Sequence, residues 1–292
     1  MRIAFQGEPG AYSEAAIFEH FGNHLQDNHL QTVPCESFEE VFACVARGDC
    51  ERGLIPVENS LAGSIHRNYD LLLQNSLAVV GEHYLRVHHC LIGLPGVTLS
   101  EIRSVISHPQ ALAQCDAYIK SLGGVKAEAA YDTAGSVKIA REKNDRTLAA
   151  IASRRAAELY GMQILAESIE DNAENITRFQ IIASQPVAPG SDAKTSIVFA
   201  LKNEPGSLFK ALSVFALRDI DLTKIESRPL AGKPWEYFFY IDFAGSIQEE
   251  VVVRALSHLE EYATYLRVLG SYPRHRLGSS EDKQILMSNK EK

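Results

Sequence analysis

The chain has 292 residues, of which 46% are hydrophobic and 23% charged, and its formal net charge at pH 7 is −8. This length suits about two domains, and the acidic balance argues against a nucleic-acid-binding protein, whose surface needs basic patches. No apolar run approaches the ~20 residues that a membrane-spanning helix needs.

The first residues and the cysteines indicate a reduced, cytosolic protein. The chain begins with MRIAFQG, which lacks the basic, apolar and small-residue succession of a secretion signal. The five cysteines form no CxxC pair and no cysteine–histidine ligand spacing, and no HxxxH pattern lies within one expected helix. We therefore expect a cytoplasmic protein with reduced thiols, no metal site and no nucleic-acid or membrane partner.

Residues 1–185 alternate strand-like and helix-like patterns, which predicts a layered α/β domain with mostly parallel strands. Ser13 is the expected N-cap of a helix over YSEAAIFEHFG that stops at Gly22. Ser37 is the expected N-cap of a helix over SFEEVFACVARGD, with Glu40 at the capping-box position. The other expected strands are RIAFQG, RGLIPVEN, two segments of AVVGEHYLRVHHCLIG on either side of Glu82, SVIS and LAAIA, and the other expected helices follow Pro109, begin in YDTAGSVKIARE and cover SRRAAELYG.

Two segments suggest that this domain has two lobes. We expect residues 77–93 to carry the chain from one lobe to the next and residues 163–183 to carry it back. Domains of this kind bind their ligands in the crevice between the lobes, at the ends of strands. The stretch ENITRF (174–179) lies in the return crossing, so we expect it at the crevice.

A second module follows a linker. Residues 186–194 are rich in proline, glycine and serine, which is typical of a linker. Residues 195–274 then give the order βαββαβ, which predicts a split-βαβ module. Residues 275–292 show no packed pattern and are expected to be a mobile tail.

Four stretches place small polar residues at strand-to-helix junctions: QGEPGAYS (6–13), PVENSLAGS (56–64), SHPQALAQ (107–114) and YDTAGS (131–136). Helix N-termini of this kind bind carboxylates or phosphates, because their free N–H groups favour negative charge. Each stretch taken singly is better explained as an N-cap or a turn, but four in one domain favour a cleft for a small anion. No nucleotide motif and no catalytic triad stands out. This predicts a binding protein or a cofactor-free enzyme that acts on a small anion, with Glu58 and Asp132 as the nearby proton carriers.

Several stretches carry a resemblance to a known family: FQGEPGAYS, IPVENSLAGSIHRNYDLL, SHPQALAQC, YDTAGS, ITRFQII and KIESRP. Over nearly all of residues 1–277 the chain resembles the prephenate dehydratases. The wording FALRDIDLTKIESRP and ENSLAGSIHRNYDLLL is also similar to the plastid arogenate dehydratases, which act on the aminated analogue of prephenate. The chain shows no transit peptide like theirs.

The resemblance implies decarboxylative dehydration of prephenate to phenylpyruvate, without a cofactor, in phenylalanine biosynthesis. It implies a catalytic domain with two periplasmic-binding-protein-like lobes and a C-terminal ferredoxin-like ACT domain that binds phenylalanine and inhibits. Thr177 is the implied catalytic residue. The implied substrate-binding residues are Asn59, Ser60, Ser107, Gln114, Asp132, Thr133, Arg178 and Phe179. The implied phenylalanine-binding residues are Gly206, Ser207, Leu208, Glu226, Ser227, Arg228 and Pro229.

Some alternatives stay open at this stage. In a regular strand Thr177 and Phe179 share one face and Arg178 lies on the other, so Arg178 could form a salt bridge instead of binding substrate. The proton donor could be Glu58, Asp132 or a water molecule. Phe209 is bulkier than the residue usual in the family at this position, which changes the shape of the effector pocket.

The function and the assembly also have alternatives. Arogenate is the rival substrate, and a non-catalytic sensor of small anions is the rival from another class. An isolated split-βαβ module leaves exposed sheet edges that side-by-side pairing would cover, so we expect a homodimer or a homotetramer.

Overall fold

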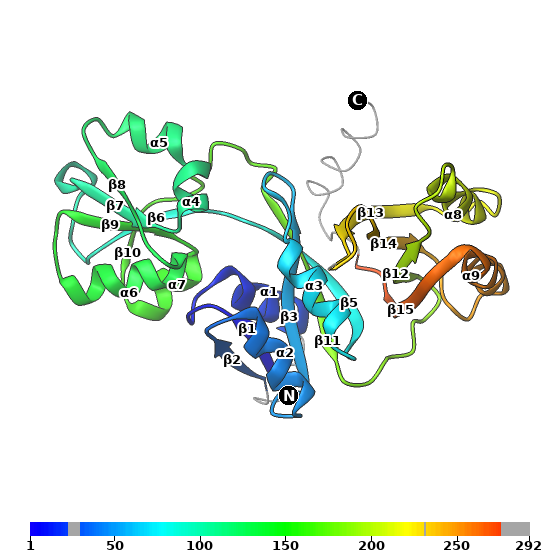
Figure 1. The fold of residues 1–292 in the computed structure, drawn as a ribbon. Coiled ribbons are helices and arrows are strands. Elements are labelled where there is room, and N and C mark those ends of the chain that lie inside the picture. Colours follow the sequence, from blue (N-terminus) through cyan, green and yellow to red (C-terminus); the bar gives the residue numbers. More distant parts are fainter. Residues whose placement is uncertain (23–29, 231, 276–292) are drawn as a thin grey trace.

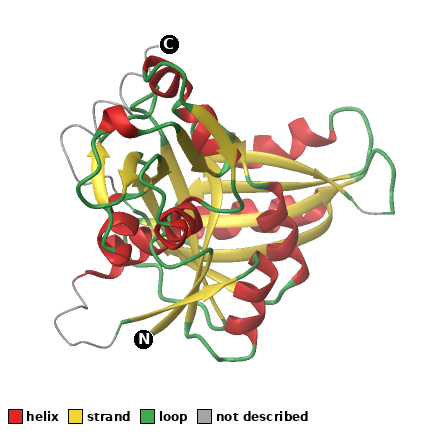
Figure 2. Cartoon of the chain, turned by 90° about the vertical axis from the view of Figure 1, so that its left-hand side faces the viewer, coloured by secondary structure: helices red, strands yellow, loops and turns green. Residues whose placement is uncertain are grey.

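The computed structural model describes residues 1–22, 30–230 and 232–275. These residues form three sheets, and Figure 1 shows the first of them lying between the other two. Figure 2 shows that helices flank the strands on the outside of the molecule. None of the helices in the described ranges is long and apolar enough to cross a membrane.

The first lobe is built on a sheet with the order β2-β1-β3-β11-β5, to which β4 adds by pairing with β3. Strands β1, β2 and β3 are parallel, whereas β11 runs antiparallel to both of its neighbours. The elements of this lobe are β1 (Arg2–Gln6), α1 (Tyr12–Phe21), β2 (Gln31–Cys35), α2 (Phe38–Ala46), β3 (Arg52–Asn59), β4 (Gly63–Ser64), α3 (His66–Gln74), β5 (Ala78–Arg86) and β11 (Ile176–Ala183).

The second lobe is built on a sheet with the order β10-β6-β9-β7-β8. Its parallel strands are β7, β8 and β9, and β6 and β10 are antiparallel additions. Its elements are β6 (Cys90–Gly93), the 3-10 helix η2 (Leu99–Glu101), β7 (Ser104–Ser107), α4 (Pro109–Gln114), α5 (Asp116–Ser121), β8 (Lys126–Ala129), α6 (Thr133–Lys143), β9 (Leu148–Ala152), α7 (Arg154–Tyr160) and β10 (Gln163–Ala166).

The third sheet has the antiparallel order β13-β14-β12-β15 and belongs to the C-terminal module, residues 193–275. Its elements are β12 (Ala193–Leu201), α8 (Ser207–Ala216), β13 (Leu222–Pro229), β14 (Tyr237–Ala244), α9 (Glu250–Tyr262) and β15 (Ala263–Pro273). This is the βαββαβ order expected from the sequence. The expected fold class, a two-lobed α/β domain followed by a split-βαβ module, is confirmed.

The C-terminal module packs tightly against the first lobe. One buried apolar cluster joins Val198 and Tyr240 of the module with Phe42 and Leu72 of the lobe. At Gly270 of β15 an added Cβ would lie 1.9 Å from the carbonyl oxygen of Val79 on β5, so only glycine fits this backbone approach. The module and the first lobe therefore share a core.

Two local expectations were wrong. Helix α1 begins at Tyr12 with Ala11 at its N-cap, so Ser13 lies inside the helix; the carboxylate of Glu14 instead accepts a hydrogen bond from the Gly10 N–H (2.8 Å). Glu82 lies in the middle of one continuous β5, and the chain breaks at residues 87–89 instead. The Ser37 cap is confirmed, since its hydroxyl accepts from the Glu40 N–H (3.2 Å). The expected mobile tail lies, apart from residue 275, outside the described residues.

Candidate active site at the crossing between the lobes

Thr177 lies near the start of β11, where the chain returns from the second lobe to the first. It pairs with Asn59 at the end of β3 on one side and with Leu85 of β5 on the other. The register of β11 with β3 shifts between Arg178 and Phe179. Thr177 is therefore held between two strands at the edge of the crossing, and it is only partly buried.

Asn59 orients the hydroxyl of Thr177. The Asn59 Oδ1 accepts from the N–H groups of Leu61 (3.1 Å) and Ala62 (2.9 Å), which fixes the orientation of the side-chain amide. Its Nδ2 therefore donates to Thr177 Oγ1 (3.0 Å) and to Asn175 Oδ1 (2.7 Å). Because Thr177 Oγ1 accepts this hydrogen bond, the hydroxyl proton of Thr177 is left to be donated elsewhere.

A chain of hydrogen bonds leads from Asn175, in the return crossing between the lobes, through Gln114 and His89 to Tyr12. Asn175 Nδ2 donates to Gln114 Oε1 (3.0 Å), which also contacts His89 Nε2 (2.9 Å). His89 Nδ1 then lies 2.7 Å from the hydroxyl oxygen of Tyr12. Since Gln114 presents its oxygen, His89 carries its proton on Nε2, and the single hydroxyl proton of Tyr12 is shared between His89 Nδ1 and the carbonyl oxygen of His88 (2.9 Å). Burial lowers the pKa of His89, which agrees with a neutral ring.

The hydrogen-bonded chain borders a cavity. Its volume is about 350 Å³. It lies next to the turn that Asn59 holds and beside Gln114 of α4. The lining residues are Leu61, Ala62, Gln110, Ala113, Gln114, Asp171 and Asn172. This cavity is a suitable place for a small ligand between the lobes.

Ser60 clamps the turn to the return crossing. Its hydroxyl donates to the carbonyl oxygen of Glu174 (2.6 Å) and accepts from the N–H of Ile176 (2.9 Å). The backbone N–H of Ser60 also donates to the carbonyl of Ile176 (2.9 Å). Ser60 therefore holds the start of β11 beside the end of β3, and its hydroxyl both donates and accepts a hydrogen bond.

Besides Gln114 of α4, three expected binding residues belong to the second lobe. Ser107 is fully buried and donates to the carbonyl of Ile151 (2.6 Å). Asp132 caps α6 by accepting from the Gly135 N–H (2.8 Å), and burial raises its pKa. Thr133 is the first residue of α6. The side-chain hydrogen bonds of Ser107 and Asp132 stay within the second lobe and do not lead to Thr177.

The loop after β1 brings the two lobes together near Asp132. A Cβ added at Gly7 would lie 3.3 Å from Asp132 Oδ2. Next to it, Glu8 Oε1 accepts from the hydroxyl of Tyr131 (3.0 Å) and lies 3.4 Å from Lys138 Nζ. Gly7 and Gly10 of QGEPG thus serve a close approach between lobes, and the expected clustering of junctions at one crevice agrees with this contact.

Arg178, Phe179 and Glu58 lie away from the Thr177 hydroxyl. Arg178 points to the opposite face, where its Nε donates to Glu82 (3.0 Å) and its Nη1 to Asp242 of the C-terminal module. Phe179 is buried in the apolar core. Glu58 pairs with Lys224 (3.0 Å). The alternation of side chains along β11 therefore gives Arg178 the salt-bridge position that the sequence left open.

The expected effector residues divide into two groups. Gly206 takes a positive φ of 81° before α8, and Ser207 and Leu208 begin that helix. On β13, an edge strand, Glu226 and Arg228 face the first lobe, while Ser227 and Pro229 are exposed.

Both charged residues of the expected effector site, Glu226 and Arg228, contact the first lobe. Glu226 accepts from Ser64 and lies 3.3 Å from His66 Nε2. Arg228 forms a two-pronged ion pair with Asp70 (2.8 and 3.1 Å). In this chain both charged residues therefore contact the first lobe.

Comparison with known proteins identifies the family. A family profile described as "Prephenate dehydratase" matches residues 3–187, and one described as "ACT domain" matches residues 195–261. The chain belongs to the prephenate dehydratase family. Members of this family are decarboxylating dehydratases, so the chain is an enzyme and the sensor alternative loses its basis.

Relatives and solved structures agree with this. The chain is 50% identical over 284 residues to "Arogenate dehydratase/prephenate dehydratase 2, chloroplastic" of Arabidopsis thaliana, with 94% of this chain and 73% of the relative covered. Prephenate dehydratase in complex with L-Phe from Arthrobacter aurescens matches with a TM-score of 0.86 and 28% identity, over 99% of this chain and 97% of that one. A chain described as GqqA, a novel type of quorum quenching acylase, matches with a TM-score of 0.86 and 36% identity, over 94% and 98%.

These comparisons confirm the fold implied by the resemblance, which is a two-lobed periplasmic-binding-protein-like domain followed by an ACT domain. They also correct one expectation. The expected cytoplasmic location is wrong, because the Arabidopsis relative is a chloroplastic protein, and its name points to the plastid. The beginning of this chain, from which the cytoplasmic location was inferred, is not informative on this point.

Proposed function

We propose that the chain converts prephenate to phenylpyruvate, carbon dioxide and water, with Thr177 as the catalytic residue. The observation that carries the assignment of Thr177 is the fixed amide of Asn59, which uses the lone pair of Thr177 Oγ1 and leaves the hydroxyl proton for donation. In the reaction the bond from the ring to the carboxylate breaks, and its electrons make the ring aromatic. The C–O bond to the ring hydroxyl breaks at the same time, and one proton turns the departing oxygen into water.

Thr177 would hydrogen-bond the departing oxygen. A threonine hydroxyl is too weak an acid to be the source of this proton, so a stronger acid nearby must supply it. Of the carboxylates named from the sequence, Asp132 is the better candidate, because burial raises its pKa and its loop contacts the first lobe. Glu58 is paired with Lys224 on the far face. A water molecule is the remaining alternative.

The substrate would occupy the cavity beside Asn59 and Gln114. Asn59 and Ser60 would shape it from the first lobe, and Gln114, Ser107, Asp132 and Thr133 from the second lobe. Asn175, His89 and Tyr12 join this set as positioning residues, because their hydrogen bonds fix Gln114 and Asn59. The sequence offered one signal for Asn175, its position two residues before Thr177.

Arogenate is a second candidate substrate. The Arabidopsis relative is named for both arogenate and prephenate. The two substrates differ only in whether the side chain carries an amine or a keto oxygen, and the dehydration at the ring is the same. The residues described at the ring end therefore serve either substrate.

The proposal is tested by the turnover of each substrate by the purified chain. Phenylpyruvate is measured by its absorbance in alkali, and phenylalanine by chromatography. We expect turnover of prephenate, and the ratio of the two kcat/KM values ranks the substrates. Faster turnover of arogenate would make it the substrate and leave the Thr177 mechanism standing. No turnover of either by folded protein would reject the proposed function.

Phenylalanine is the proposed feedback inhibitor. The Arthrobacter enzyme of the same fold was solved with L-Phe. Residues 1–185 would be the catalytic domain, 186–194 the linker and 195–274 the regulatory domain. The proposed effector residues are Gly206, Ser207, Leu208, Glu226, Ser227, Arg228 and Pro229.

The working form is proposed to be a homodimer or a homotetramer. The apolar side chains exposed on the C-terminal module support this, because Phe209 and Leu217 of that module are 77% and 78% exposed. Within one chain Glu226 and Arg228 of β13 contact the first lobe, so pairing of two modules would bring the α8 start of one copy to the β13 edge of the other. That contact would form the phenylalanine site.

A further inference from the structure

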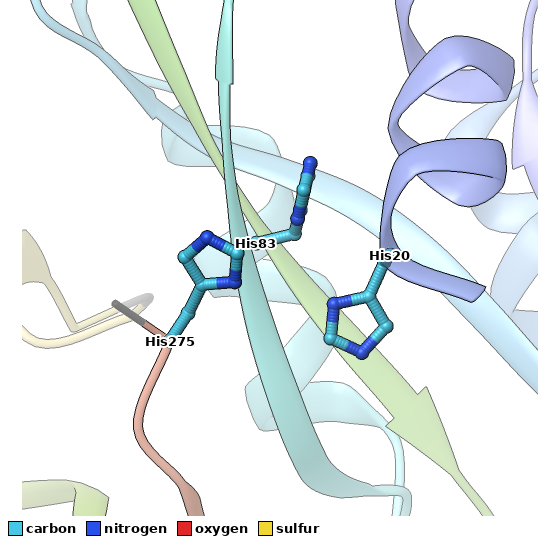
Figure 3. A group of neighbouring side chains, drawn as sticks. All are labelled: His20, His83 and His275. Carbon is cyan, nitrogen blue, oxygen red and sulfur yellow. The ribbon is translucent and has the colours of Figure 1, made fainter. Parts of the chain in front are cut away.

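Three histidines from distant parts of the sequence meet beside the first lobe (Figure 3). His20 lies near the end of α1, His83 on β5, and His275 just after β15. One ring nitrogen of each lies within 4.8 Å of one ring nitrogen of the other two. The ring centroids of His83 and His275 are 4.7 Å apart, and those of His20 and His83 are 5.5 Å apart.

His83 is the buried member of this group. Its side chain is 5% exposed, and neither of its ring nitrogens makes a hydrogen bond within the described residues. A buried polar ring that makes no hydrogen bond costs free energy, so it calls for an explanation. Its polar neighbour from α1 is the exposed carboxylate of Glu19, which lies 3.3 Å from His83 Nε2.

His275 is held in place by its backbone. Its N–H donates to Glu82 Oε1 (3.3 Å), the carboxylate that also binds Arg178 and Lys194. A neutral imidazole with an available lone pair is the form that binds metal ions.

We propose that His20, His83 and His275 bind a divalent transition-metal ion, Zn²⁺ being the first choice, with the Glu19 carboxylate as the fourth ligand. Imidazole nitrogens with one carboxylate suit Zn²⁺. In a tetrahedral site with bonds of about 2.1 Å, the ligand atoms are about 3.4 Å apart, so small rotations of the rings would close the group onto an ion.

No pattern in the sequence indicated this site, and we expected no metal site. The usual signal is a short spacing between ligands in one segment. These three residues instead lie on α1, on β5 and just after β15. A metal ion here would fasten the exit of the C-terminal module to α1 and β5. The site is separate from the Thr177 hydroxyl and does not depend on the proposed function.

One other group of metal-binding atoms in the described residues must be kept apart from it. Cys35, Glu40 and Cys44 also approach within 4.8 Å of one another. Burial raises the pKa of Cys35 to about 12, so its thiol stays protonated and is a poor ligand. A Cys44→Ser variant is therefore the control for binding by thiolates.

The test is metal binding by the full chain after chelation and desalting. Zn²⁺ is titrated by calorimetry and counted by elemental analysis, and Co²⁺ serves as a spectroscopic probe of ligand type. We expect one ion per chain, a rise in the melting temperature on adding Zn²⁺, and a Co²⁺ spectrum of tetrahedral nitrogen and oxygen ligands without the intense near-ultraviolet band of thiolate. Cys44→Ser should leave all three unchanged.

Single substitutions identify the ligands. His83→Gln and His275→Gln should each weaken Zn²⁺ binding at least about tenfold, in line with the losses seen when metal surroundings are altered. His258→Gln on α9 is the matched control and should bind as the parent chain does. His275 lies after β15 and is only partly buried, so we expect its variant to fold, which circular dichroism checks. No binding by the parent chain, or unchanged affinity in the His83 and His275 variants, would overturn the proposal.

Discussion

At Thr177 the side chain accepts a hydrogen bond from Asn59, while the next residue, Arg178, leaves the same strand on the other face. The Arg178 guanidinium is buried between Glu82 and Asp242, which belong to the first lobe and the C-terminal module. Two adjacent residues thus serve two separate purposes. One faces the proposed chemistry, and the other joins two parts of the chain.

Replacing Thr177 with valine tests the first of these purposes. Valine keeps the branched shape and the strand preference but removes the hydroxyl. We expect kcat to fall by about 10²-fold or more, because the departing oxygen loses its hydrogen bond. Steady-state kinetics with prephenate and arogenate measure this, and Thr147→Val, in an exposed loop, is the control. Near-normal turnover by folded Thr177→Val would remove Thr177 from the mechanism.

The pH dependence of stability tests the second purpose, in which Arg178 and Asp242 join the first lobe to the C-terminal module. Burial alone would raise its pKa, but the charge of Arg178 and the hydrogen bonds from Ser196 and Arg178 outweigh burial and lower it. A lowered folded pKa gives stability that is present above the unfolded pKa of about 3.9 and is lost as pH falls below it. The free energy of unfolding should therefore decrease as pH drops below about 4.

The Asp242→Asn variant supplies the comparison. It should be about 3–5 kcal/mol less stable at pH 7, because it breaks a buried ion pair, and it should lose stability less steeply in acid. Urea unfolding at a series of pH values measures both effects. Asp219→Asn, at an exposed position, should behave as the parent chain. An equal acid dependence in Asp242→Asn and the parent would contradict this account.

Among the elements, β13 has the most unusual surroundings. It is an edge strand whose alternate side chains, Lys224, Glu226 and Arg228, contact the first lobe. The same glutamate and arginine are proposed to take part in binding phenylalanine. One side chain cannot fully satisfy both partners, so phenylalanine would have to compete with the contacts to Ser64 and Asp70.

Substituting Asp70 with asparagine measures this competition. The change removes the carboxylate charge that pairs with Arg228, and it substitutes no residue proposed to bind substrate or phenylalanine. We expect phenylalanine to inhibit at a concentration several-fold lower, with uninhibited kcat unchanged. Inhibition curves and calorimetry on the full chain give both numbers. Asp116→Asn on α5 is the control, and an unchanged or raised inhibitory concentration in Asp70→Asn would argue against competition.

For the whole molecule, the distribution of exposed apolar side chains is uneven. Most of the large ones lie on the C-terminal module, including Phe209, Leu217 and Trp235. The opposite face of the same module is covered, because its core is continuous with that of the first lobe. An apolar surface left open on one side only is typical of a protein that pairs with another copy.

Phe209→Glu should therefore disrupt the oligomer. A charge at this position would have to be buried against the partner, which is unfavourable. We expect light scattering to give a dimer or tetramer for the parent chain and a smaller species for the variant. Leu159→Glu, on α7 of the second lobe, introduces the same charge at another exposed apolar position and should not change the mass. A monomeric parent chain would contradict the proposed assembly.

Much of this architecture could be predicted from the sequence. Hydrophobic patterns and caps such as Ser37 identified most strands and helices, because these signals are local. Four strands were missed: β4, which has only two residues, β10, β2 and β8. The last two have a clear physical reason. Both are sheet edges; β2 contains Pro34, and every residue of β8 is exposed, so neither shows the alternation on which such predictions depend.

The proposed site was less predictable. Thr177 and Asn59 were found through short motifs, and the structure brings them together. The links through Asn175, His89 and Tyr12 depend on which segments the fold places side by side, and no local spacing encodes this. Arg178 is the instructive case, because the motif that contains it suggested substrate binding, while the alternation of the strand directs it to Asp242.

The position of β11 between the two halves of the chain has a thermodynamic consequence. Its residues contact β3 and β5 on either side, and Arg178 ties it to the module proposed to bind phenylalanine. If an effector changes the free energy of substrate binding through this strand, linkage requires that the substrate change the free energy of effector binding by the same amount. Saturating substrate would then lower the affinity of the enzyme for the inhibitor. The supply of precursor in the cell would therefore set the concentration of end product that is needed to stop the pathway.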